Sequence, residues 1–428
     1  MKIAMFTNTY LPHVGGVARS VKTVADACRE RGHEVRIIAP DFEGAEPSPE
    51  VLRVPAIQNF NGSDFSVRLP LPLMVRDFIT AFDPDLIHSH HPFLLGDTAL
   101  REAWKQQIPV VFTHHTLYER FTHYVPLDSP ALKRVAIQLA TEYCNRCDQV
   151  IAPSESIAHL LREREVTVPI EIIPTGIDTA FFAAGNGARF REKFGIPPEA
   201  RVIGHLGRIA KEKNVAFLAS AAALCLHADP GAVFLIVGEG DALDEMLAIL
   251  NGEGVGRQIH AIEKQSGAGL ADAYAAMDIF IFASHAETQG LVLAEAMAAG
   301  KPVVALDGPG VREIVRDGEN GRLLPAGAPV REFADALAGL MHDPELSRRC
   351  PVTAGKSAEA FSTERCVGRL LDCYQRLLAQ ARPRREADST LWDRFQTGVG
   401  IEWKLLEEKM AALGAALSET SATRTLPE

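Results

Sequence analysis

The sequence predicts an α/β protein with two parallel-sheet domains. Three observations support this prediction. The chain has 428 residues, which is long for one domain. A strand–helix–strand pattern occupies residues 2–39, and the same pattern restarts at residue 202. Between residues 278 and 305, an apolar strand, a polar loop, a helix and another apolar strand follow one another, as in a parallel sheet with helical crossovers.

Composition narrows the class of protein. Apolar residues make up 47% of the chain and charged residues 23%, which suits ordinary globular cores. The net charge of -11 argues against a nucleic-acid-binding protein. Seven scattered cysteines fit a reducing cytoplasm. We find no signal peptide and no run of 18 apolar residues, so we expect a cytoplasmic protein without a membrane span, while surface attachment stays open.

The first half of the chain reads as alternating strands and helices. A strand at 2–6 leads into a loop with Gly15 and Gly16, then an amphipathic helix at 18–31 and a strand at 34–39. The two glycines let the backbone approach a ligand closely, although a tight turn is the alternative. Further strands are expected at 85–88, 110–113, 149–152 and 170–174, a helix at 71–82, and a helix that begins with Ser154 as N-cap.

Histidines follow two of these strands, where a parallel sheet binds ligands. They are His88, His90, His91, His114 and His115. Zinc is an alternative interpretation, but no acidic ligand stands at metal-site spacing, so we assign no metal. Cys144 and Cys147 have no partner pair and are expected to be packed thiols. Asp83-Pro84-Asp85 is expected to be a helix-to-strand turn.

The second half restarts with a strand at 202–206, followed by a loop that contains Arg208 and Lys213. A planar guanidinium and a mobile ammonium beside a strand end suit a diphosphate. The alternative is a solvated basic loop. A further strand is expected at 233–237.

The stretch 278–304 carries the strongest functional signal. Its strand at 278–282 leads into a loop with Glu287 and Gly290, and then into a helix at 291–299 that Gly300 and Pro302 end. A helix N-terminus attracts phosphate. Glu287 precedes the helix and Glu295 lies about one turn inside it, so each carboxylate could accept hydrogen bonds from the hydroxyls of a sugar or a ribose. A nucleotide sugar fits this order, and two solvated glutamates are the alternative.

The same stretch resembles a known family. Glu-x7-Glu, followed by Ala-Met-Ala-x-Gly-x-Pro-Val-Val, resembles the retaining glycosyltransferases of the GT-B type, family 4. Glu-Thr-Gln-Gly at 287–290 resembles the branch that glycosylates diacylglycerol and related lipids, whereas most of the wider family has an aromatic residue in place of Gln289. The resemblance covers residues 1–382 and implies two Rossmann-like parallel-sheet domains that face each other across a cleft.

The resemblance also implies a reaction. A hexose would pass from a nucleotide-diphosphate sugar, with a UDP-hexose expected, to a hydroxyl acceptor such as a lipid, with retention and without a metal or cofactor. His115 would face the transferred sugar, Arg208 and Lys213 would hold the diphosphate, and Glu295 would hold the ribose. The implied catalytic residues are His115, Arg208, Lys213 and Glu287. The implied donor-binding residues are Gly15, Gly16, Arg208, Lys213, Glu287, Thr288, Gln289, Gly290, Leu291 and Glu295.

The expected organisation has four parts. An acceptor-side domain spans 1–177, a nucleotide-sugar domain spans 178–365, a helix at 366–382 crosses back to the first domain, and an amphipathic extension spans 383–428. The extension is expected to pack on the body or on a second subunit, giving a homodimer. The alternative is a helix on the inner membrane surface.

Other functions stay open from the sequence. They are a sugar-nucleotide epimerase of GT-B-like fold, a glycosyltransferase for a soluble or polysaccharide acceptor, and a non-catalytic nucleotide-sugar binding protein. A dinucleotide-dependent dehydrogenase is disfavoured because no Gly-x-Gly-x-x-Gly follows the first strand.

Overall fold

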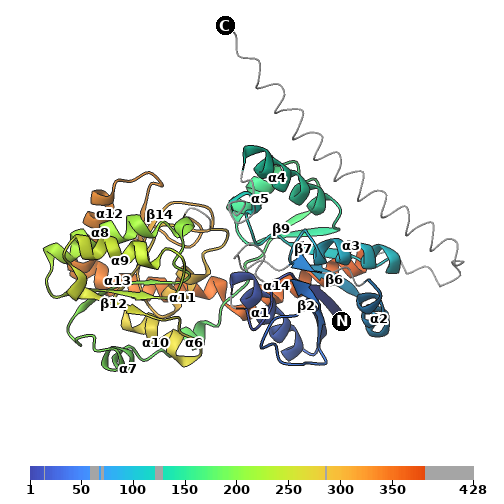
Figure 1. Ribbon diagram of the computed structural model, residues 1–428, viewed down its shortest axis with the longest axis horizontal. Helices are drawn as coiled ribbons and strands as arrows, with labels where there is room; N and C mark the ends of the chain where they lie inside the picture. Colours follow the sequence, from blue (N-terminus) through green and yellow to red (C-terminus); the bar gives the residue numbers. More distant parts are fainter. Residues whose placement is uncertain (14, 58–66, 69–71, 121–128, 285–286, 381–428) are drawn as a thin grey trace, which may run out of the picture. The chain divides into compact units, whose positions relative to one another are not determined.

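The computed structural model describes the chain except residues 14, 58–66, 69–71, 121–128, 285–286 and 381–428. The described chain divides into two compact units (Figure 1). The first unit comprises residues 1–175 and the segment from residue 367, and the second comprises residues 176–366. Each unit is built on a parallel sheet, which confirms the predicted α/β class with two Rossmann-like domains.

The first unit contains a seven-stranded sheet in the order β3-β2-β1-β6-β7-β8-β9, with every neighbouring pair parallel. Its strands are β1 (Lys2–Phe6), β2 (Glu34–Pro40), β3 (Val51–Val54), β6 (Leu86–Ser89), β7 (Val110–Thr113), β8 (Gln149–Ala152) and β9 (Ile170–Ile172), with a separate antiparallel pair β4 (Ala56–Ile57) and β5 (Val67–Arg68). Its helices are α1 (Gly16–Glu30), α2 (Pro72–Phe82), α3 (Leu95–Gln106), α4 (Pro130–Asn145), α5 (Glu155–Glu163) and α14 (Thr363–Gln380), most of which belongs to this unit.

Both faces of the first sheet are covered, so its strands are apolar on each side. Successive side chains of a strand point to opposite faces. Ile3 and Met5 pack with α1 and α14, whereas Ala4 and Phe6 pack with α2, α3, α4 and α5. Burial on two sides explains the uninterrupted apolar run that the sequence shows in β1.

The second unit contains a six-stranded sheet in the order β12-β11-β10-β13-β14-β15, again parallel throughout. Its strands are β10 (Arg201–Leu206), β11 (Ala232–Val237), β12 (Ile259–Ile262), β13 (Ile279–Phe282), β14 (Val303–Leu306) and β15 (Gly321–Leu324). Its helices are α6 (Thr179–Ala183), α7 (Gly187–Lys193), α8 (Val215–Ala228), α9 (Leu243–Gly252), α10 (Ala268–Ala276), α11 (Leu291–Ala298), α12 (Val330–His342) and α13 (Pro344–Ala358).

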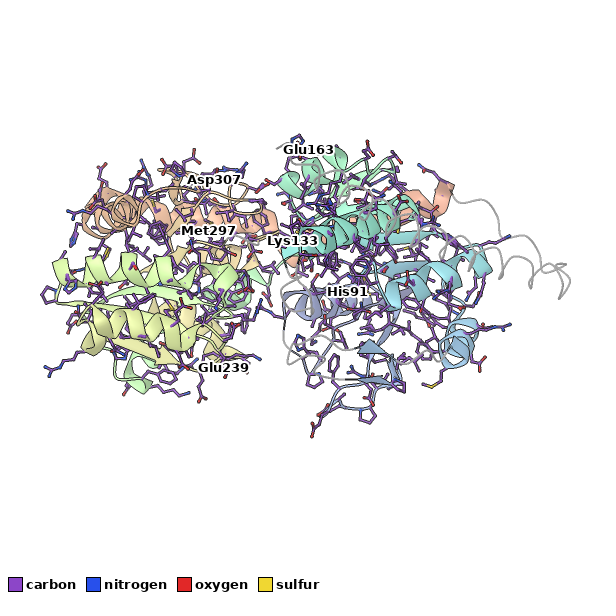
Figure 2. The ribbon with its side chains drawn as sticks, turned by 45° about the horizontal axis from the view of Figure 1, so that its top comes forward. His91, Lys133, Glu163, Glu239, Met297 and Asp307 are labelled. Carbon is purple, nitrogen blue, oxygen red and sulfur yellow. The ribbon has the colours of Figure 1, made fainter. Side chains whose placement is uncertain are left out.

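Two apolar layers cover the second sheet. Ile279 and Ile281 of β13 pack with α8, α9 and α12. Phe280 and Phe282 of the same strand pack with α6, α7, α10, α11 and α13, the layer in which Met297 of α11 is fully buried (Figure 2). These layers fix α11, and with it the loop that precedes the helix.

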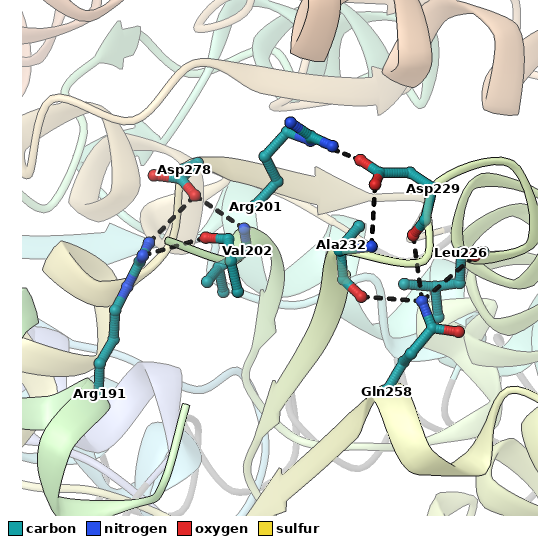
Figure 3. Close-up of polar contacts among 10 residues, drawn as sticks. Arg191, Arg201, Val202, Leu226, Asp229, Ala232, Gln258 and Asp278 are labelled. Carbon is teal, nitrogen blue, oxygen red and sulfur yellow. Dashed lines mark hydrogen bonds and ion pairs between the residues drawn. The ribbon is translucent and has the colours of Figure 1, made fainter. Parts of the chain in front are cut away.

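Ion pairs and hydrogen bonds join the residues at the amino ends of the strands in the second sheet. Asp278 Oδ2 accepts hydrogen bonds from the Val202 amide at 2.7 Å and from Arg191 Nη2 at 3.0 Å, as Figure 3 shows. Arg201 and Asp229 form a second pair on the same edge. These contacts hold the strand starts in register, and they leave the carboxyl edge to the loops.

The strand orders reverse between β1 and β6 and between β10 and β13. In open parallel sheets, ligands bind beside the carboxyl ends of the strands at such a reversal. The loops after β1, β6, β10 and β13 are therefore the candidate ligand-binding loops. They contain the glycine loop, the histidine runs, the Arg208–Lys213 loop and the Glu287 stretch.

The other predicted elements are confirmed with ends that differ by one or two residues, whereas the helix predicted at 366–382 begins three residues earlier, at Thr363. The helix predicted at 18–31 begins at Gly16, and the strand predicted at 170–174 ends at Ile172. Ser154 caps α5, because its hydroxyl accepts a hydrogen bond from the Ile157 amide. All seven cysteines are buried and none forms a disulfide, and Cys144 and Cys147 are packed thiols as expected. Among the described helices, none is long and apolar enough to cross a membrane.

The helix α14 is tied to the first sheet by a buried hydrogen bond. Tyr374 Oη lies 2.6 Å from His88 Nδ1, and both residues are almost fully buried. Replacing Tyr374 with phenylalanine leaves that nitrogen without its partner, so we expect a loss of about 1–3 kcal/mol of local stability. Hydrogen exchange of the β1 and β6 amides measures this loss in the first unit alone.

The control for this change lies on the same helix. Arg376 pairs with Glu171 at the surface, and Arg376→Gln should leave the exchange rates of the β1 and β6 amides almost unchanged. Unchanged exchange in Tyr374→Phe as well would show that the His88 contact contributes nothing.

Candidate active site

Glu287 is the centre of a hydrogen-bonded loop after β13. Its Oε1 accepts hydrogen bonds from three successive amides, at 3.2 Å from Thr288, 3.4 Å from Gln289 and 3.1 Å from Gly290. The family resemblance implied that these three residues bind the donor. In the structure all three amides donate to the Glu287 carboxylate. This side chain therefore fills the anion-binding position that the three amides form.

The loop after β10 reaches the same carboxylate. Lys213 ends a 3-10 turn, Lys211–Lys213, and its Nζ lies 3.1 Å from Glu287 Oε2. The ammonium also lies 5.8 Å from the centre of the Phe282 ring. Both side chains of the pair are mostly buried, at 22% and 16% exposure. The structure thus brings together two residues 74 positions apart, at the reversal of the strand order.

The charge of Glu287 is set by these contacts. Burial by itself raises the pKa of the carboxyl group. The Lys213 ammonium and the amides of Gly290 and Gln289 outweigh that effect and hold the pKa below its ordinary value. Glu287 is therefore an anion at neutral pH, suited to accept hydrogen bonds and not to donate a proton.

Gly290 lies at the junction between this loop and α11. Its φ of 73° is left-handed, a conformation that glycine adopts without strain. The helix that follows has no side-chain cap and no acidic residue in its first turn. The Glu287 carboxylate, bonded to the amide of the N-cap residue Gly290, therefore offsets part of the partial positive charge of this N-terminus.

Arg208 does not lie open in the loop after β10. Its Nη2 donates to the carboxylate of Glu212, one helical turn further along the chain. The backbone carbonyl of Glu212 in turn accepts a 3.4 Å hydrogen bond from Ser284 Oγ, which follows β13. A diphosphate held by Arg208 would therefore compete with Glu212 for the guanidinium.

Glu295 is placed differently from the surface position that its predicted role suggests. It is fully buried on α11, and its Oε2 accepts a 2.7 Å hydrogen bond from Tyr274 Oη of α10. The ribose contact stays a prediction. Gln289 is 6% exposed, and Leu291 packs on the apolar layer beneath α11, so the ligand-facing part of this loop is mostly backbone.

In the first unit, Gly15 and Gly16 stand at the start of α1. Gly15 is its extended N-cap residue, and no side chain caps the helix. A Cβ on Gly16 would meet nothing within 4 Å, so space beside this residue is open. The two glycines therefore present bare backbone at a helix N-terminus, next to the reversal between β1 and β6.

The histidines after β6 and β7 form a connected cluster. His90 Nδ1 lies 2.9 Å from His115 Nε2, and the rings of His88 and His90 are 4.1 Å apart. His91 Nδ1 accepts a 3.0 Å hydrogen bond from the Asn8 amide, and this bond joins the loops after β1 and β6 (Figure 2 labels His91). His115 is half-buried, whereas the other histidines of the cluster are almost fully buried.

Burial keeps these imidazoles neutral. It lowers the pKa of His88 and of His91 to about 3 and that of His114 to about 4. It also lowers the pKa of His90 and His115 well below the ordinary value, with neighbouring histidines adding to the effect. Within the described ranges, no group of three or more His, Cys, Asp and Glu residues is arranged to hold a metal ion.

Comparison with known proteins adds to this geometry. Residues 14–181 match the model of glycosyltransferase family 4, and residues 187–356 match the model of glycosyl transferases group 1. A GDP-mannose-dependent alpha-mannosyltransferase of Mycolicibacterium smegmatis is 30% identical over 390 residues, covering 89% of this chain and 98% of the relative. The chain belongs to the family 4 glycosyltransferases.

Other relatives of this glycosyltransferase act on lipids or inositol phosphate. An alpha-monoglucosyldiacylglycerol synthase of Acholeplasma laidlawii is 27% identical over 390 residues, covering 87% of this chain and 97% of the relative. A D-inositol 3-phosphate glycosyltransferase of Actinosynnema mirum is 33% identical over 304 residues, covering 68% and 72%.

Solved structures share the fold of this glycosyltransferase. A sucrose-phosphate synthase of Thermosynechococcus elongatus superposes with a TM-score of 0.72 at 20% identity, covering 88% of this chain and 99% of that one. The Anabaena protein HepE, in complex with UDP and glucose, gives 0.71 at 20% identity, covering 88% and 100%. These likenesses confirm the GT-B type of fold.

Two cavities of the second unit lie away from the site of this glycosyltransferase. They measure about 570 and 390 Å³ and share Lys301, which precedes β14. Arg191 lines the first and Asp278 the second, so both open at the amino ends of the strands. Because parallel sheets bind ligands at the opposite edge, the loop around Glu287 is the better candidate for a binding site.

Four residues that contact candidate site residues were given no role from the sequence, although His90 was among the histidines expected at the ligand-binding edge. They are His90, Glu212, Tyr274 and Gly310, which contact His115, Arg208, Glu295 and the backbone at 288–289, respectively. Only the i, i+4 spacing of Arg208 and Glu212 could have indicated a contact. The other three join different elements, for which the sequence carries no local signal.

Proposed function

We propose that this glycosyltransferase moves a hexose from a nucleoside diphosphate sugar to a hydroxyl group of a lipid, with diacylglycerol as the first candidate acceptor. The ion pair of Lys213 with Glu287 at the strand reversal is the observation that carries the proposal. The Glu-Thr-Gln-Gly sequence at 287–290 and the diacylglycerol-glucosylating relatives support the lipid acceptor. The mannosyltransferase relatives give a reason to include GDP-mannose beside UDP-hexoses as donor.

The reaction in this proposal depends on electrostatic stabilisation of the leaving group. The bond between the anomeric carbon and the diphosphate breaks, and negative charge grows on the diphosphate oxygens. Lys213, Arg208 and the N-terminus of α11 would stabilise that charge. Arg208 would leave Glu212 to do so, which the exposed position of the guanidinium allows, at 39%.

The sugar and the nucleoside would be held by the two glutamates. The anionic Glu287 would accept hydrogen bonds from sugar hydroxyls, and Glu295 would accept them from the ribose once the interior contact with Tyr274 opens or is shared. In the first unit, His115 would face the transferred sugar, and Gly15 and Gly16 would bind the donor through their backbone. The acceptor hydroxyl would attack the face that the diphosphate leaves and pass its proton to the phosphate, so the configuration is retained.

A product assay with the full chain tests this function. The protein is incubated with UDP-glucose, UDP-galactose or GDP-mannose, with diacylglycerol vesicles or soluble sugars as acceptor, and with or without EDTA. We expect sugar-labelled lipid with the donor's anomeric configuration, nucleotide release that depends on lipid, and no effect of EDTA.

The other outcomes are distinct. Interconversion of the donor sugar without an acceptor would indicate an epimerase, and thermal stabilisation by donors without turnover would indicate a binding protein. Transfer only to soluble sugars would refute the lipid acceptor. Activity that EDTA abolishes and a divalent ion restores would refute the metal-independent mechanism. The proposed homodimer and membrane contact involve residues 383–428, which lie outside the described residues.

A further inference from the structure

His90 and His115 share one hydrogen bond at the carboxyl edge of the first sheet. His90 follows β6, and His115 follows the neighbouring strand β7. The 2.9 Å separation joins His90 Nδ1 to His115 Nε2, and the two rings are nearly parallel, at 21°. Two neutral imidazoles can make this bond only if one of these nitrogens carries a proton and the other does not.

The neighbourhood keeps both rings neutral. His88 and His91 surround His90, and His91 and His114 adjoin His115. Burial is the largest cause of the lowered pKa of each ring, and the neighbouring imidazoles lower it further. The charged groups that act on His114 are Arg164 and Glu119, which pair with each other at 2.6 Å.

The surroundings of His90 Nε2 indicate which of the two histidines donates the proton in the bond between them. His90 is 1% exposed, and its Nε2 has no hydrogen-bond partner within the described ranges. A proton on Nε2 would bury an unsatisfied N–H donor, at a cost of about 1–3 kcal/mol. A proton on Nδ1 instead satisfies the donor through His115, and leaves only an acceptor lone pair unfilled, the more readily tolerated defect.

We propose that His90 is a positioning residue that donates its Nδ1 proton to His115 Nε2 and so fixes His115 as the Nδ1–H tautomer. His115 then meets a ligand as a neutral hydrogen-bond donor. It cannot act as the general base, because one nitrogen already accepts a hydrogen bond and the other carries a proton. This inference rests on the proposed function, in which His115 faces the transferred sugar, a group rich in acceptor oxygens.

Nitrogen NMR of the full-length protein, labelled with ¹⁵N-histidine, tests the tautomer directly. The His115 signals are identified by their loss in His115→Asn. We expect a protonated Nδ1 and an unprotonated Nε2 in the wild type. A proton on His115 Nε2 would overturn the proposal, and this measurement needs neither a substrate nor a variant of His90.

Two substitutions of His90 test its positioning role. His90→Asn keeps an N–H donor near the place of Nδ1, whereas His90→Leu removes it. We expect His90→Asn to keep the His115 tautomer and most of kcat. We expect His90→Leu to give a mixture of tautomers and a kcat about 10–100-fold lower, the size of effect seen when a metal-bound histidine loses its outer partner. The exposed His159 gives the control, His159→Asn, with unchanged kcat.

A pair of changes at His115 separates its roles. Asparagine places an N–H donor near Nδ1 and glutamine places one near Nε2, so His115→Asn should retain more transfer than His115→Gln. Equal loss in both, or an unchanged His115 tautomer in His90→Leu, would overturn the proposal. If the wild type turns over no sugar nucleotide, the proposed function fails, while the NMR result still decides the tautomer.

Discussion

Replacing Lys213 with methionine should lower kcat for sugar transfer by about 10²–10³-fold, and it should also lower the unfolding temperature, because Glu287 stays buried without its cation. Methionine keeps most of the length and apolar volume of the side chain, so its packing over Phe282 remains. What disappears is the cation 3.1 Å from Glu287, which in the proposed reaction stabilises the departing diphosphate. Steady-state kinetics with a saturating donor measures the effect.

Lys211 provides the matched control for this change. It lies in the same 3-10 turn as Lys213 and is exposed. Lys211→Met removes the same charge two positions away, and kcat should stay within about twofold if a specific contact is responsible rather than the net charge of the loop. Equal losses in the two variants would contradict the assignment of Lys213.

The same substitution should shift the pH profile. In the wild type, Lys213 and the loop amides hold the pKa of Glu287 below its ordinary value despite burial, so the carboxylate persists as the pH falls. Without Lys213 the effect of burial is opposed only by the amides, and the pKa rises. The acid limb of kcat/KM should therefore move to higher pH in Lys213→Met. A profile that keeps its acid limb would show that the ion pair does not control this carboxylate.

Replacing Gly310 with alanine should lower kcat/KM by about 100-fold, although Gly310 is not itself among the predicted ligand-binding residues. Gly310 follows β14 and supports the loop that carries Glu287. A Cβ built on it would lie 2.6 Å from the Gln289 amide nitrogen and 2.7 Å from the Thr288 carbonyl carbon. These are backbone atoms, so the alanine must displace the amides that bind Glu287.

Gly318 allows the two effects of this alanine to be separated. Gly310 and Gly318 have almost the same φ, 74° and 73°, but a Cβ on Gly318 would meet nothing within 4 Å. Both alanines carry a left-handed backbone strain of about 1–2 kcal/mol. Only Gly310→Ala adds the collision, expected to cost about 1–3 kcal/mol more in the second unit. Similar activity in the two variants would show that the loop position is uncritical.

Much of the fold was readable from the sequence because it depends on local patterns. Apolar runs such as 279–282 predicted buried parallel strands, and Gly300 with Pro302 marked the end of α11. The order of strand, loop and helix placed Glu287, Lys213 and the histidines after strands, which is the edge where the structure has them. The signature around Glu287 and Glu295 led to the correct family.

The contacts inside the site were not readable, because they join residues distant in the chain. From the sequence, both glutamates were expected to accept hydrogen bonds from ligand hydroxyls, Glu287 from the sugar and Glu295 from the ribose. The structure gives them different surroundings. Glu287 accepts hydrogen bonds from three amides and from Lys213, whereas Glu295 is buried and accepts a hydrogen bond from Tyr274. Side-chain direction depends on how α10 and α11 pack on the sheet, and no spacing within 287–295 encodes that packing.

The sequence by itself determined which elements form, their order, and the chemical groups that each loop carries, because propensity and apolar periodicity act over a few residues. Only the tertiary structure decided which of those groups meet. It paired Lys213 with Glu287, turned Arg208 onto Glu212, and joined His90 to His115. The pairs of Lys213 with Glu287 and of His90 with His115 exist because the strand order brings distant loops to one edge of a sheet, where burial removes water and leaves neighbouring side chains as partners.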